Sequence, residues 1–249
     1  MAAPKRYSLA DVRRSYTPAK ARAELRGELP AYLLYRPLSF PIAWLLLRLG
    51  VPTIAVTAGC GALAVAVLAA AISGGAHAYL CVAGCGLAFH VLDCVDGNMA
   101  RTTGEASRFG ALLDGLCDYA FWSALLCALG VLAGNVPLGM GCAIVVLLGR
   151  DVRQHYALLF GAPAVLADGT SAISARQWLL YALAGLENLY APAIGLAGAL
   201  GKLALLLDGV ALYVGAIAFA STLMALGKAR RSDSDRAQHE AGVLPTERE

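Results

Sequence analysis

Four aspartates, Asp93, Asp96, Asp114 and Asp118, interrupt an otherwise strongly apolar part of the chain. Residues three or four apart on a helix share a face, so the four make one acidic pair on each of two consecutive segments. A charged residue deep in a membrane helix costs about 2.5–3.5 kcal/mol on insertion scales, so these carboxylates need compensation. One or two divalent cations with oxygen ligands would provide it. The pattern predicts a metal-assisted site that handles phosphate.

The spacing of the aspartates also predicts their depth. At about 1.5 Å per residue, Asp93 and Asp118 each lie about 15 Å along a helix from the connecting loop 101–108. If the two helices are antiparallel neighbours, these two lie at similar depth, and Asp96 and Asp114 pair nearer the loop. All four can then line one cavity that opens at the loop side.

Composition indicates the class of protein in which this site lies. Of the 249 residues, 59% are hydrophobic and only 15% charged, against about 45–50% and about 25% in soluble domains. This excess favours an all-α, polytopic membrane protein. The net charge of +3 is too small to suggest a nucleic-acid partner.

Six transmembrane helices are predicted, because about 20 apolar residues are needed to cross a bilayer. They make up a catalytic domain over residues 51–228, with glycine-rich turns on one side of the membrane. The expected spans are 53–73, 78–100, 108–133, 137–160, 177–199 and 203–227.

Three further segments flank this domain. Residues 1–30 are polar and basic and form a cytosolic arm, and residues 31–50 mix apolar and basic side chains. We interpret 31–50 as an interfacial amphipathic helix along the membrane surface; a simple polar lead-in to the first span is the alternative. Residues 229–249 form a polar cytosolic tail, without regular structure from Ser232 onward.

The distribution of basic residues predicts the orientation. Arg101, Arg108 and Arg176 fall in the loops on the side that holds both termini, whereas the opposite loops carry only Lys202. The positive-inside rule then puts both termini and the mouth of the site in the cytoplasm, as for a protein of a bacterial inner membrane. Frequent small residues within the spans suit close helix packing and a homodimer.

Residues 93–118 read D-x-x-D-G-x-x-A-R, then eight residues, then G-x-x-x-D-x-x-x-D. This resembles the signature of the CDP-alcohol phosphotransferases (CDP-alcohol phosphatidyltransferases), with all eight fixed positions filled. The six spans and the preceding surface helix also look like that family, so the resemblance covers about residues 31–228. One departure precedes the first span: many relatives carry Thr-Pro-Asn there, whereas this chain has Val51-Pro52-Thr53, followed by Thr57.

The resemblance implies roles for the aspartates. Asp93, Asp96 and Asp114 would hold the Mg²⁺ or Mn²⁺ that bridges the diphosphate of the donor. Asp118 would be the general base and a further metal ligand. It would take a proton from an alcohol, which attacks the β-phosphorus of a CDP-linked donor such as CDP-diacylglycerol, and CMP would leave. Phospholipid biosynthesis is the process that this reaction serves.

The remaining signature positions would shape the pocket for the cytidine and its phosphates. They are Gly97, Ala100, Arg101 and Gly110. Arg101 brings a fixed positive charge near the mouth, suited to a phosphate or to a structural ion pair.

The acceptor is suggested by basic residues farther along the chain. Members of the family that use inositol phosphate or glycerol phosphate carry basic residues in the corresponding regions, so Arg150, Arg153 and Arg176 are candidate anchors for an acceptor's phosphate. Arg150 or Arg153 could instead neutralise Asp151, and Arg176 could be an interfacial residue that snorkels.

Two other functions compete with this one. An aromatic prenyltransferase also uses aspartate-rich helices but normally needs two separated motifs and more spans. A carboxylate-based ion or proton carrier would have intramembrane acids too, but should show inverted repeats or broken helices. The sequence has one contiguous aspartate motif, which counts against the prenyltransferase. It shows no inverted repeats or broken helices, which counts against the carrier.

Overall fold

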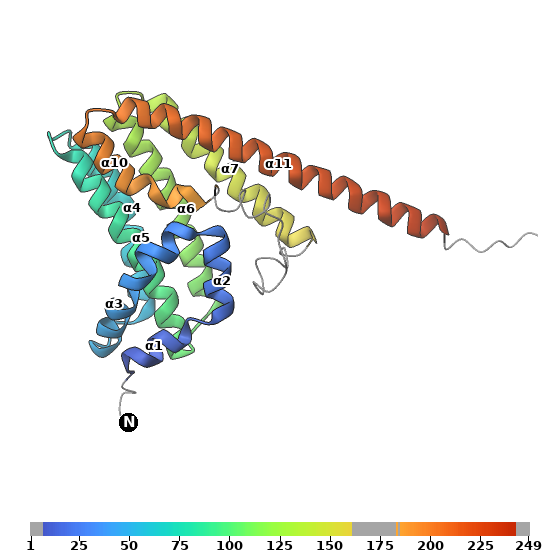
Figure 1. Cartoon of the computed structure of the whole chain (residues 1–249), viewed down its shortest axis with the longest axis horizontal. Helices are drawn as coiled ribbons and strands as arrows, with labels where there is room; N and C mark the ends of the chain where they lie inside the picture. The colour runs from blue at the N-terminus through green and yellow to red at the C-terminus, as the bar shows by residue number, and fades with distance from the viewer. Residues whose placement is uncertain (1–6, 161–182, 184, 243–249) are drawn as a thin grey trace, which may run out of the picture.

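A computed structural model describes residues 7–160, 183 and 185–242, and every regular element in these ranges is helical. This confirms the all-α prediction. Figure 1 shows a bundle from which one long C-terminal helix projects. In chain order the elements are α1 (Leu9–Ser15), α2 (Pro18–Gly27), the π-helix η1 (Ala31–Tyr35), α3 (Arg36–Arg48), α4 (Thr53–Ile72), α5 (Ala78–Thr103), α6 (Arg108–Leu132), α7 (Val136–Phe160), the 3₁₀ helix η2 (Gly185–Leu189), α10 (Tyr190–Ala199) and α11 (Leu203–Gly242).

Four helices are long and apolar enough to cross a membrane: α4, α5, α6 and the Leu203–Ser232 part of α11. Helix α7 has the length, but every 18-residue stretch of it contains Arg150, Asp151 and Arg153. The predicted span 177–199 lies partly outside the described residues. The six-span count therefore stays a prediction.

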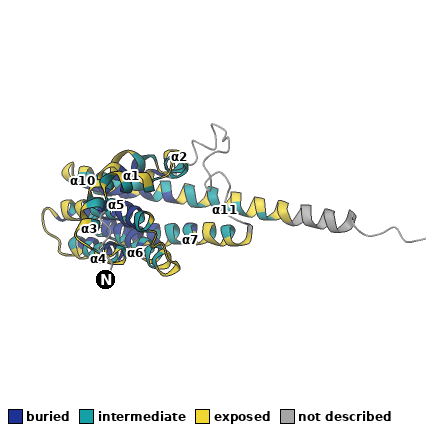
Figure 2. Ribbon diagram, turned by 90° about the horizontal axis from the view of Figure 1, so that it is seen from below, coloured by how far each residue is buried: buried dark blue, intermediate teal, exposed yellow. Residues whose placement is uncertain are grey.

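Helix α4 organises the centre of the bundle, because it packs closely against both α5 and α6, which touch each other only sparsely. Helix α6 packs on α7, and α7 on α11. Figure 2 shows buried residues concentrated in the bundle and not along the projecting part of α11. At the core, Phe89 of α5 stacks on Phe121 of α6 with ring centroids 3.5 Å apart.

Short turns hold the antiparallel helices in register. Helix α5 ends at Gly104, whose φ of +75° favours glycine, and α6 starts at Ser107, whose Oγ accepts a hydrogen bond from the Gly110 amide at 3.0 Å. Helices α6 and α7 cross at two glycines: a Cβ on Gly139 would lie 2.7 Å from the Cα of Gly130. Only glycine allows this approach.

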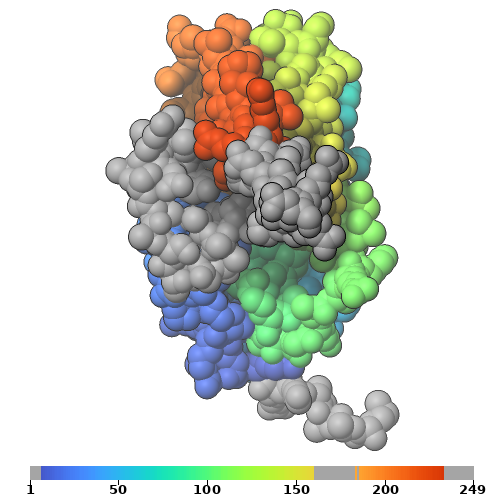
Figure 3. All heavy atoms as spheres, turned by 90° about the vertical axis from the view of Figure 1, so that its right-hand side faces the viewer, coloured from blue at the N-terminus to red at the C-terminus, as the bar shows by residue number. Residues whose placement is uncertain are grey.

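The N-terminal segments form helices that pack on the bundle. Helices α1 and α3 both contact α5 (Figure 1), and in Figure 3 the N-terminal residues lie beside the green residues of α5 and α6 at one end of the molecule. The segment predicted as an interfacial helix is helical, as η1 and α3, and exposes Leu33, Leu38 and Leu45. Its position at a membrane surface stays a prediction.

The C-terminal tail is helical over more of its length than the sequence predicts. Helix α11 continues past Lys228 to Gly242, whereas residues from Ser232 onward were expected to lack regular structure. The reason is compositional: residues 228–241 contain no glycine or proline and several good helix formers.

The arm is fixed by a buried ion pair between Glu24 of α2 and Arg36 of α3. The Glu24 carboxylate, 1% exposed, accepts hydrogen bonds from Arg36 Nε at 3.0 Å and from the Tyr16 hydroxyl at 2.7 Å. Burial works to raise the pKa of Glu24, but the hydrogen bonds and charge of Arg36, with the Tyr16 bond, outweigh it and hold this pKa below its ordinary value of 4.5.

This pair predicts an acid-sensitive arm. Because the folded-state pKa of Glu24 lies below the unfolded-state value, the stabilisation is complete above about pH 4.5 and is lost as the pH falls through the lowered value. Amide exchange of α2 in detergent, corrected for intrinsic rates, should accelerate on acidification in the wild type. The Glu24→Gln protein should lack this step. Protection of α2 that is independent of pH would contradict the prediction.

Candidate functional site

Three of the four predicted metal ligands converge. Asp93 and Asp96 of α5 and Asp114 of α6 each offer one carboxylate oxygen, and these oxygens lie within 4.8 Å of one another. Asp96 is buried and the other two are half-buried. Among the ion pairs of the described residues, none involves these three aspartates. The arrangement fits a divalent cation with oxygen ligands from two helices.

Helix α4 orients one of these carboxylates. The Thr57 hydroxyl, buried in α4, donates a hydrogen bond to Asp96 Oδ2 at 2.9 Å. On the α6 side, the Cys117 thiol lies 3.4 Å from the carbonyl oxygen of Thr57. Thr57 therefore links both helices of the site and fixes one Asp96 oxygen, as residues behind metal ligands commonly do.

Asp118 stands outside this three-oxygen group. Its side chain is 31% exposed, and its Oδ2 lies 3.9 Å from Nη1 of Arg150. The same guanidinium donates from Nη2 to Glu187 Oε1 at 3.1 Å and lies 5.1 Å from the ring centroid of Trp122. Arg150 thus bridges two carboxylates over an aromatic face. The predicted metal-ligand role of Asp118 stays a prediction.

Arg153 lines a small open cavity together with Glu187 of η2 and Tyr213 of α11. The other walls of this cavity are small and apolar residues of α7 and α11. Asp151 Oδ1 lies 3.3 Å from Nδ1 of His155. No ion pair between Asp151 and Arg150 or Arg153 is found among the described residues. Arg176 lies outside the described residues.

The small signature residues Gly97, Ala100 and Gly110 make room for Arg101 or form hydrogen bonds through their backbones at the helix ends. A Cβ on Gly97 would lie 3.1 Å from Nη1 of Arg101, so the missing side chain makes room for that guanidinium. The Ala100 carbonyl accepts the bond that ends α5, and Gly110 donates to the cap of α6. Their predicted contact with a nucleotide stays a prediction.

Two site features are not predicted by the sequence. Glu187 of η2 accepts a hydrogen bond from Arg150 of α7 and also lines the cavity beside Arg153. Thr57 was noted only because it follows the altered Val-Pro-Thr segment. A polar side chain on α4, an otherwise apolar helix, was the signal that could have identified it.

Removal of the Thr57 hydroxyl should weaken cation binding without unfolding the protein. We expect Thr57→Val to raise the Mn²⁺ dissociation constant, measured by electron paramagnetic resonance of free Mn²⁺, by about tenfold. Thr57→Ser should keep wild-type affinity because it retains the donor. Ser123→Ala, which removes a hydroxyl bonded to its own helix, is the matched control. Equal affinities of Thr57→Val and the control would refute the role of Thr57.

Comparison with known proteins gives one family. The family model described as CDP-alcohol phosphatidyltransferase matches residues 51–227. The matched range contains the three-aspartate cluster, Asp118 and the cavity at Arg153, and excludes helices α1 to α3. No curated protein sequence matches the chain.

Proposed function

The chain belongs to the CDP-alcohol phosphatidyltransferase family, and we propose that it transfers a phosphatidyl group from CDP-diacylglycerol to an alcohol, with release of CMP. Family membership itself makes it a membrane phosphotransferase of phospholipid synthesis. The observation that carries the proposal is the cluster of Asp93, Asp96 and Asp114, which no described ion pair neutralises. The family match gives no support to the prenyltransferase or carrier alternatives.

The cluster is suited to Mg²⁺ or Mn²⁺. A cation bound there would offset the charge of the diphosphate and of the departing CMP. Asp93, Asp96 and Asp114 would be its protein ligands, with Thr57 holding Asp96 in place. Arg101, beside Gly97, would add positive charge at the pocket for the cytidine and its phosphates.

Asp118 is proposed as the general base. It lies one helical turn beyond Asp114 and outside the three-oxygen group, so its carboxylate remains available for a proton. It would take the hydroxyl proton of the acceptor while the acceptor oxygen bonds to the β-phosphorus. The bond between that phosphorus and the oxygen of CMP then breaks. Arg150, whose Nη1 lies 3.9 Å from Asp118 Oδ2, would hold this side chain in place.

The cavity beside Arg153 supports an anionic acceptor, such as inositol phosphate or glycerol phosphate. Arg150 is already engaged by two carboxylates, so Arg153 is the stronger candidate for the acceptor's phosphate. Arg176 is proposed as a further anchor. We also propose that both termini lie in the cytoplasm, that the membrane is a bacterial inner membrane and that the protein forms a homodimer. The orientation rests on the charges of the loops, and the homodimer rests on the small residues of the spans.

The proposed reaction is tested by metal-dependent CMP release. Purified protein given labelled CDP-diacylglycerol and a panel of inositol, inositol phosphate, glycerol phosphate and serine should form CMP with at least one acceptor, and a chelator should abolish it. Asp118→Asn should reduce kcat by about 100-fold or more at unchanged melting temperature. Full activity in that variant would refute the base assignment. Absence of CMP with every acceptor would refute the reaction.

The acceptor site is tested by charge reversal at Arg153. Arg153→Glu should raise the KM of the acceptor by at least about tenfold and that of the donor by less than about twofold, because a charge-assisted hydrogen bond is lost. Lys202→Glu reverses an exposed charge in the turn before α11 and should change neither. An unchanged acceptor KM in Arg153→Glu would count against an anionic acceptor at this cavity.

A further inference from the structure

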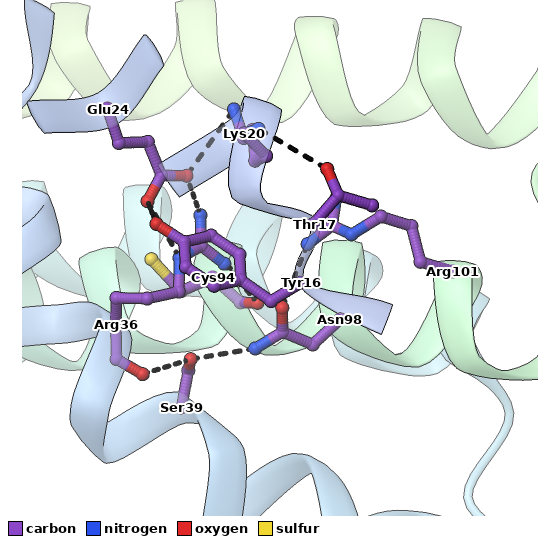
Figure 4. Close-up of polar contacts among 9 residues, drawn as sticks. All are labelled: Tyr16, Thr17, Lys20, Glu24, Arg36, Ser39, Cys94, Asn98 and Arg101. Carbon is purple, nitrogen blue, oxygen red and sulfur yellow. Dashed lines mark hydrogen bonds and ion pairs between the residues drawn. The ribbon is translucent and has the colours of Figure 1, made fainter. Parts of the chain in front are cut away.

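The ion pair of the N-terminal arm continues into the signature helix. Arg36, whose Nε and Nη2 face Glu24, donates from Nη1 to the Cys94 carbonyl at 3.1 Å and to Asn98 Oδ1 at 3.2 Å (Figure 4). Cys94 and Asn98 are one turn apart on α5, at variable positions of the signature. The arm is therefore linked through Arg36 to the helix that carries Asp93 and Asp96.

Asn98 is the point at which two guanidinium groups meet. Its Oδ1 accepts from Arg36 and also from Nη2 of Arg101 at 2.8 Å, while its Nδ2 donates to Ser39 Oγ at 2.8 Å. The side chain is fully buried. The Ser39 hydroxyl in turn donates to the Arg36 carbonyl at 2.7 Å. With both of its ends occupied, the Asn98 amide has one orientation, and its oxygen faces the two arginines.

We propose that Glu24 is a positioning residue for Arg101, acting through Arg36 and Asn98 to hold the Arg101 guanidinium at the pocket for the donor's diphosphate. This rests on the proposed function of the site. Asn98 uses one N–H of Arg101 and the guanidinium lies over Gly97. The remaining donors of Arg101 are thereby kept in a defined direction.

The charge of Glu24 is what makes this arrangement stable. Arg36 and Arg101 share the buried Asn98 oxygen as acceptor, so two like charges lie close together, one on the buried Arg36 and one on the exposed Arg101. Glu24 compensates Arg36 with two hydrogen bonds, and Tyr16 and Lys20 complete its coordination. Removing one partner of a buried ion pair leaves the other uncompensated. Without Glu24, Arg36 would repel Arg101 across Asn98 and displace it.

This proposal extends the catalytic unit beyond the range that the family model matches. The family match starts at residue 51, whereas Glu24, Arg36 and Ser39 precede it. The arm is then part of the donor site and not only a cytosolic extension.

Steady-state kinetics of Glu24→Gln test the proposal. We expect a rise of about tenfold in the KM of CDP-diacylglycerol, equivalent to the loss of about one charge-assisted hydrogen bond. The kcat and the acceptor KM should stay within about twofold. Arg14→Gln, which removes an exposed ion pair of the same arm, should leave all three constants unchanged. A donor KM that is also unchanged in Glu24→Gln would overturn the proposal.

A double-mutant cycle separates positioning from general destabilisation. Arg101→Gln should raise the donor KM, and adding Glu24→Gln should raise it no further, because Glu24 acts through Arg101. Effects that multiply would contradict the proposal. If Glu24→Gln does not fold, Arg36→Lys replaces it, since an ammonium cannot span Glu24 and Asn98 as the guanidinium does. Calorimetric binding of CDP with Mg²⁺ should weaken in parallel. A wild type that neither binds CDP nor releases CMP would refute the proposed function itself.

Discussion

Three carboxylate oxygens from two apolar helices lie within 4.8 Å of one another. Ionised groups at that separation repel by about 3–4 kcal/mol per pair at an effective dielectric constant of 20, and the rest of the structure must hold them there. The glycine-ended turn after α5 and the capped start of α6 bring the segments back alongside each other. Helix α4 then packs on both α5 and α6.

Glu24, Glu187 and Asp118, which lie outside this cluster, have arginine partners. Glu24 faces Arg36, and Glu187 and Asp118 share Arg150. Both groups of pairs involve segments outside α5 and α6. The three aspartates of the cluster differ from these three carboxylates in having no basic partner among the described ion pairs. Arginine suits both groups of pairs because its planar group can bridge two acceptors.

The sequence was sufficient for features that depend on local spacing. The recurrence of aspartates at three and four residues predicted the convergence of four side chains, of which Asp93, Asp96 and Asp114 lie together, and glycines in the turns predicted the boundaries of α4, α5 and α6. It was not sufficient for contacts between distant segments. Thr57 reaches Asp96 only because α4 packs beside α5, and Arg150 meets Glu187 across 37 positions of the chain. No sequence pattern predicts the contacts among Glu24, Arg36 and Asn98, because these contacts depend on how the N-terminal helices pack on the bundle.

The central claim is that a divalent cation binds between Asp93, Asp96 and Asp114. The most direct test is a crystal structure of the protein with Mn²⁺, with diffraction data collected at an energy where manganese scatters anomalously. The account predicts an anomalous peak bonded to oxygens of all three carboxylates, and its loss in Asp96→Asn crystals. A structure with saturating Mn²⁺ and no peak between these side chains would contradict it.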